Sequence, residues 1–78
     1  MPLTAIIIHV TQPGKRAGVL LDAATSHLGR ETPAADERGH IRILLEEPEG
    51  AAWDHVHDAL DAAGDDWHEY LHMNARPA

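Results

Sequence analysis

Two apolar segments with different patterns predict the strands of this chain. Residues 3–10 form a continuous run rich in isoleucine, bounded by Pro2 and by the polar stretch 11–14. Such a run is typical of a strand that is buried on both faces at the centre of a sheet. Residues 40–47 instead alternate, with Ile41, Ile43 and Leu45 on one face. The sequence therefore predicts two strong strands.

The segments after these strands have helical spacing. The first helix follows Pro13, with Thr11 as its N-cap, Gly29 as its stop and an apolar stripe of Ala17, Leu20, Leu21, Ala24 and Leu28. The second begins at Pro48 and ends at Gly64, with an apolar stripe of Trp53, Val56, Leu60 and Ala63. Each stripe predicts a helix that covers one side of the sheet.

Residues 67–73 fit either a helix or a strand. Helical spacing pairs Trp67 with Leu71, whereas strand parity also places Met73 on their face. The break at 64–66 and the aromatic content favour an edge strand. A weaker edge strand is expected at 30–35, before a tight turn at 36–39. We therefore expect a single α/β domain over residues 1–73 and a flexible C-terminal tail over 74–78.

This order of elements predicts an α+β fold of the ferredoxin-like α/β plait type, βαββαβ, with the second strand short or absent. Two helices would cover one face of an antiparallel sheet, and the first and third strands would be central. Without the weak strand, the alternative is a three-stranded parallel βαβαβ layer.

Composition narrows the class of protein. The chain has 78 residues, no cysteine and a formal charge of −7, so we expect one small core without disulfides or thiolate metal sites. An acidic chain disfavours nucleic acid as a partner, and residues 3–10 are too short to cross a membrane or serve as a signal peptide. We expect a cytoplasmic protein that gains stability as a homo-oligomer, most simply a dimer.

Strand parity gathers six polar residues on the sheet face opposite the helices. These candidate ligand-binding residues are His9, His40, Arg42, His68, Tyr70 and His72. The half-apolar face resembles the one that dimeric α+β barrels bury around a cavity, although no motif supports the likeness. The simpler interpretation is that the histidines are polar strand residues or dimer contacts.

Two further groups are candidates on the helices. Gly14, Lys15 and Arg16 occupy a first helical turn, where an anion would relieve the unfavourable charge; surface pairing with carboxylates is the alternative. On the second helix, His55 and His57 point to different sides. The acidic residues there share one stripe, which indicates a solvated face; they are Asp54, Asp58 and Asp61.

The predicted function is a small, non-enzymatic, self-associating module that binds a protein or a small ligand on its open sheet face. One alternative is a cofactor-independent enzyme with His9 or His68 as general base, and Tyr70 and Arg42 orienting the substrate. Another is a divalent-metal-binding protein, for which the spacing identifies no ligands. We expect no cofactor, and no catalytic residue can be named, since Ser26 lies within a helix and cysteine is missing.

Overall fold

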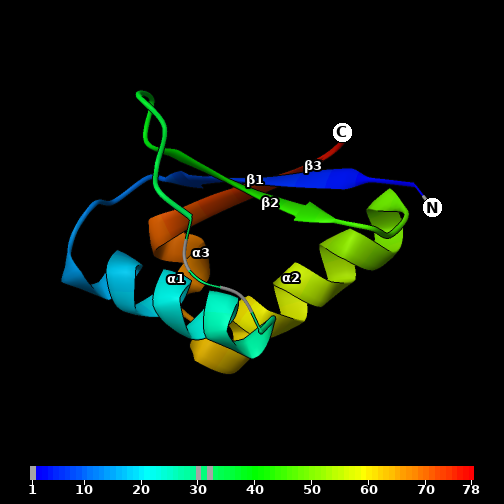
Figure 1. The fold of residues 1–78 in the computed structure, drawn as a ribbon. Coiled ribbons are helices and arrows are strands. Elements are labelled where there is room, and N and C mark those ends of the chain that lie inside the picture. Colours follow the sequence, from blue (N-terminus) through cyan, green and yellow to red (C-terminus); the bar gives the residue numbers. More distant parts are fainter. Residues whose placement is uncertain (1, 30, 32) are drawn as a thin grey trace.

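A three-stranded antiparallel sheet carries all the helices on one of its faces (Figure 1). The computed structural model describes residues 2–29, 31 and 33–78. The strands are β1 (Thr4–Val10), β2 (His40–Leu45) and β3 (Leu71–Pro77). The helices are α1 (Lys15–His27), α2 (Glu49–Ala63) and the single turn α3 (Trp67–Tyr70). This arrangement confirms the predicted ferredoxin-like layout with its second strand absent from the described residues.

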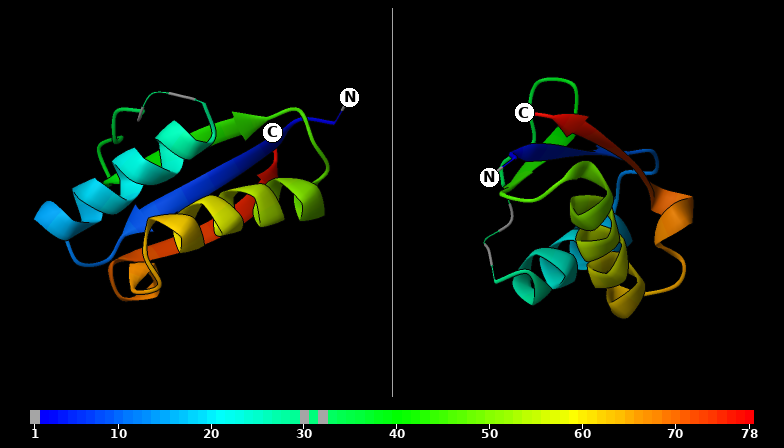
Figure 2. Two further views of the ribbon diagram at one scale, coloured as in Figure 1. Left: turned by 90° about the horizontal axis from the view of Figure 1, so that it is seen from below. Right: turned by 90° about the vertical axis from the view of Figure 1, so that its right-hand side faces the viewer.

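The sheet is built around β1, which pairs with β2 on one side and with β3 on the other. Both pairings are antiparallel, so the parallel βαβαβ alternative is wrong. In this register His9 lies opposite His40 on β2 and opposite His72 on β3. The face of the sheet opposite these histidines packs against α1 and α2, which Figure 2 shows side by side beneath the strands.

The core forms where the inward residues of the strands meet the apolar stripes of the helices. Ile6 and Ile8 of β1 are completely buried, as are Leu20 of α1 and Leu60 of α2. The inward side chains predicted from strand parity are buried or packed against this core. Among the described residues, no helix combines the length and the apolar character that a bilayer span requires.

The helix ends agree with the sequence at three positions of four. Gly29 follows α1 at φ +72°, a conformation that glycine adopts without strain, and the Gly64 N–H closes α2 on the Leu60 carbonyl. α2 follows Pro48, also as expected. The predicted N-cap of α1 is wrong: Gly14 occupies the cap position without a side-chain bond, and the Thr11 N–H donates to the Tyr70 carbonyl at 2.7 Å.

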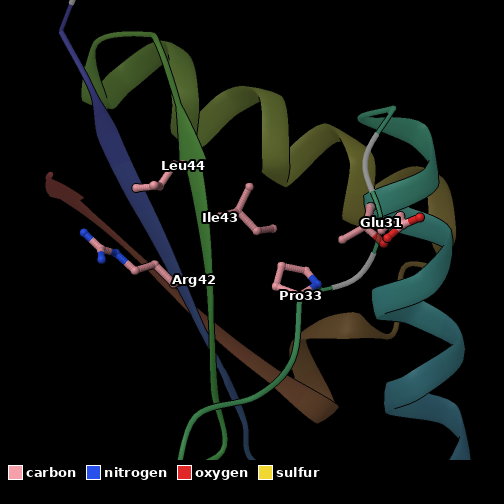
Figure 3. Close-up of a pocket in the computed structure, with 6 residues that line it drawn as sticks. Glu31, Pro33, Arg42, Ile43 and Leu44 are labelled. Atoms are coloured by element: carbon pink, nitrogen blue, oxygen red, sulfur yellow. The ribbon is translucent and has the colours of Figure 1, made fainter.

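The weak strand expected at 30–35 does not form in the residues that are described. Arg30 and Thr32 of that segment lie outside them, and Glu31 and residues 33–35 have no strand structure. Because Pro33 has no N–H to donate, it is a poor ladder residue. Consequently β2, which was expected to be central, lies at the edge of the sheet. A hollow of about 460 Å³ lies beside it, where Pro33 faces Ile43 (Figure 3).

The predicted strand at 67–73 is wrong in its first half. Residues 67–70 form the turn α3, in which the Trp67 N–H donates to the Gly64 carbonyl and the Glu69 N–H to the Asp66 carbonyl. The strand begins at Leu71 and continues to Pro77. Residues 74–77 therefore pair with β1 and do not form the expected loose tail.

Strand parity makes a direct prediction for stability, because neighbouring isoleucines of β1 face opposite sides. Ile8 is fully buried in the core, whereas Ile7 is partly exposed on the other face. We expect Ile8→Ala to lower the free energy of unfolding by about 2–5 kcal/mol. The control Ile7→Ala should cost clearly less. Urea denaturation measures both, and equal losses would contradict the assigned faces.

Candidate functional site

The open sheet face is the side of the sheet turned away from the helices. The register aligns nine of its residues in three rows that run across β2, β1 and β3 in that order. The rows are Leu44, Ala5 and Arg76; Arg42, Ile7 and Asn74; and His40, His9 and His72. Aligned residues of neighbouring strands lie close enough for their side chains to interact, so the open face is a compact polar surface with an apolar centre.

Three histidines therefore lie side by side at one end of this face. His9 is the middle member, and its ring centroid lies 4.7 Å from that of His40, with the planes at 75°. His72 is the aligned partner of His9 on the other side. Imidazole rings both donate and accept hydrogen bonds. The row thus presents several donors to anything bound above it.

A tight turn at residues 36–39 forms the rim beside the histidine row. It stands beyond the sheet on the side opposite the helices (Figures 1 and 2). Its backbone is closed by the Gly39 N–H, which donates to the Asp36 carbonyl at 3.0 Å, and Gly39 has φ +77°. Asp36 Oδ1 accepts the N–H groups of His40 at 2.8 Å and Arg38 at 2.9 Å. These bonds, the one from His40 above all, lower the pKa of Asp36.

Sheet and turn together enclose a hollow of about 290 Å³. Its lining concentrates positive charge, since it contains three of the five lysines and arginines that the structure describes, whereas Asp36 is its one acidic member. The residues that line it are Ile7, His9, Asp36, Arg38, His40, Arg42, His72, Asn74 and Arg76. The hollow is therefore a positively charged region in a chain whose net charge is −7.

The structure brings together four of the six predicted site residues. His9, His40, Arg42 and His72 line the hollow, whereas His68 and Tyr70 are in α3 and do not. Helical geometry removes these two from the sheet's alternation, because side chains in a single turn point around an axis. The residues predicted to act together in the enzyme alternative are thereby separated.

Five residues of the hollow were not among the predicted site residues, and three of them, Arg38, Asn74 and Arg76, are hydrogen-bond donors. Asn74 and Arg76 were assigned to a loose tail, and Arg38 to a turn of no stated role. The alternation of His72, Asn74 and Arg76 with Met73 and Ala75 was the signal that the strand continues. For Arg38 there was no such signal, because its position depends on how the turn folds over the sheet.

The basic pair at the start of α1, Lys15 and Arg16, does not line the hollow. Arg16 donates from Nε to Asp66 Oδ2 at 2.9 Å and from Nη2 to Asp66 Oδ1 at 2.6 Å. This bidentate pair lowers the pKa of Asp66 and raises that of Arg16. Gly64 leaves room for it, since a Cβ there would collide with the guanidinium. Arg16 thus has a carboxylate of the protein itself as its partner, which matches the alternative given for this pair.

A second cluster of histidines lies in the helix layer. His57 and Asp61 of α2 and His68 of α3 bring one ligand atom each within 4.8 Å of one another. His55 is not part of it, since its Nδ1 lies 2.7 Å from Glu47 Oε1. These side-chain types are ordinary metal ligands.

No protein-family model, curated protein or solved structure matches this chain significantly. The residues and the geometry of the two sites described above are therefore the basis for inferring a function.

The Arg16–Asp66 pair predicts a pH-dependent contribution to stability. The pKa of Asp66 is lower in the folded protein than its ordinary value of 3.8, so the pair stabilises the fold above that pH and the contribution is lost as the pH falls through the lowered value. We expect Asp66→Asn to reduce the melting temperature slightly at pH 7, because both groups are exposed.

Thermal unfolding of wild type and variant between pH 7 and pH 2 measures this difference, which should shrink at the acidic end. The matched control is Asp65→Asn at the exposed neighbouring position. An equal effect of the two substitutions, or a difference that does not depend on pH, would contradict the assignment.

Proposed function

We propose that this protein is a non-enzymatic module that binds a small anion, with phosphate or carboxylate groups, on its open sheet face. One observation carries the proposal: Arg38, Arg42 and Arg76 surround a single hollow together with the histidine row. Guanidinium groups held around one hollow repel one another, and a bound anion would offset that repulsion.

The chemistry of the lining suits such a ligand. A guanidinium binds a carboxylate or phosphate through two parallel hydrogen bonds. Arg42 and Arg76 come from the two strands that flank β1, and Arg38 comes from the rim. A ligand seated between them would therefore be approached from three directions. Asn74 adds an amide donor, and Ile7 provides an apolar floor.

The one carboxylate of the hollow, Asp36, offsets only one of its three guanidinium charges, so the hollow keeps a net positive charge. Asp36 Oδ1 is already bonded to two backbone N–H groups, so its role is to hold the turn that carries Arg38. The volume of about 290 Å³ lies near the lower end of the range for ligand sites. This supports a small ligand rather than a nucleotide or a peptide.

The expected homodimer would form through the same open sheet face. If two copies packed face to face, their arginines would meet like charges across the interface. An anion bound in each hollow offsets that repulsion, while Leu44, which is 38 % exposed beside the hollow, supplies apolar contact. We therefore propose that dimerisation depends on the bound anion.

The first test measures the binding of inorganic phosphate and, separately, of citrate by titration calorimetry at low ionic strength and pH 7. We expect both to bind, and Arg42→Gln to weaken binding at least about tenfold, because a charge-assisted bidentate contact is lost. The relative affinity of the two probes distinguishes a phosphate ligand from a carboxylate ligand.

The matched control is Arg16→Gln, which removes the same charge from the helix layer. It should change the affinity less than about twofold. Equal weakening by both substitutions would indicate a non-specific charge effect, and the absence of binding at millimolar anion would contradict the proposal.

The second test is sedimentation velocity with and without saturating citrate. We expect a monomer without citrate and a dimer with it. Leu44→Ser should weaken the dimer yet retain anion binding, because it removes apolar contact without adding a charge and Leu44 does not line the hollow. A dimer that forms equally well without any polyvalent anion, or a monomer at saturation, would contradict the linkage.

A further inference from the structure

The cluster in the helix layer combines three metal-ligating side chains from two elements. His57 and Asp61 are one helical turn apart on α2 and so share a side of the helix. The break after Gly64 folds α3 back, which brings His68 to them. None of its members lines the hollow on the open sheet face, and the two sites adjoin at His72, which lines that hollow and also the depression that holds His57 and His68.

The spacing of the ligand atoms is close to that around a bound ion. His57 Nδ1 lies 3.2 Å from Asp61 Oδ2. Two ligands at about 2.0–2.1 Å from a tetrahedral zinc ion would be about 3.3 Å apart. His68 supplies the third ligand atom, and the three atoms all lie within 4.8 Å of one another.

The carboxylate is already oriented for this role by a residue behind it. The Trp67 indole Nε1–H donates to Asp61 Oδ1 at 2.7 Å, and Asp61 Oδ2 is the oxygen that approaches His57. Trp67 is only 3 % exposed, so the core holds its indole in place. Hydrogen bonds from a second layer of residues commonly orient metal ligands in this way.

The same indole also supports one of the imidazoles. His68 stacks on Trp67 with ring centroids 3.6 Å apart and an interplanar angle of 30°. An ordinary ion pair one helical turn apart would account for His57 and Asp61, but it would not account for His68. Two imidazoles and a carboxylate around one point form a donor set that suits zinc and nickel.

We propose that His57, Asp61 and His68 bind a divalent transition-metal ion of the zinc or nickel class. Three protein ligands leave at least one coordination position for water or for an external ligand. The site would fasten α3 to the end of α2, because its ligands come from both helices.

The tryptophans of the chain give the test its readout. Both rings lie beside His57, with centroids 6.4 Å away for Trp53 and 5.4 Å away for Trp67. Paramagnetic Ni²⁺ bound there should quench their fluorescence, whereas Zn²⁺ should not. We would titrate the full chain, without an affinity tag, with Ni²⁺ by fluorescence and with Zn²⁺ by calorimetry at pH 7.5. One equivalent is expected to bind in each case.

Two variants remove ligands without disturbing the core. His68→Gln changes an exposed residue, and Asp61→Asn keeps an oxygen that can accept the Trp67 hydrogen bond while removing the charge. Each should weaken binding at least about tenfold. The controls are His55→Gln, on the same helix but paired with Glu47, and His9→Gln in the histidine row. Both should bind as the wild type does, and circular dichroism checks that every variant is folded.

Binding that is lost in His9→Gln but kept in His68→Gln would overturn the assignment in favour of the open sheet face. The absence of stoichiometric heat and of quenching would overturn the site altogether. Neither outcome decides the anion titration, since none of the three proposed metal ligands lines the hollow.

Discussion

The pairing of β1 with a strand on each side is the interaction on which the rest of the structure depends. Backbone hydrogen bonds to β2 and β3 fix the register of both neighbours at once. Because the side-chain period of a strand is two, that register assigns every residue of the sheet either to the core or to the open face. A slip of one residue would bury His9 and expose Ile8. The buried isoleucines therefore determine where the histidines lie.

The fold separates charge as well as polarity. Most acidic residues lie in or beside the helices, while Arg38, Arg42 and Arg76 line the hollow on the opposite side. Arg16, in the helix layer, has its own carboxylate in Asp66. Of the four other cations that the structure describes, all but Lys15 of α1 are therefore concentrated on one face, which is the arrangement that attracts a small anion despite the negative charge of the whole chain.

The single turn α3 decides how the C-terminal residues are divided between two surfaces. Trp67 enters the core and donates to Asp61, which places His68 beside His57 instead of on the sheet. From Leu71 the chain is extended, so His72, Asn74 and Arg76 join the open face. This short segment thus contributes different residues to the two candidate sites: His68 to the cluster in the helix layer, and His72, Asn74 and Arg76 to the open sheet face.

Local periodicity was sufficient to predict the two strong strands, the helix stops at Gly29 and Gly64 and the residues that enter the core, because each depends on neighbours in the sequence. It also grouped His9, His40, Arg42 and His72 correctly. At Trp67 and Leu71 it was ambiguous, since a helix and a strand both place these two residues inward. Only the tertiary structure decided that region, and it alone aligned the three histidines, set Arg38 on the rim and brought His68 to His57. The physical reason is that strand register and helix packing join segments far apart in the chain, and the pattern within one segment does not encode its position relative to another.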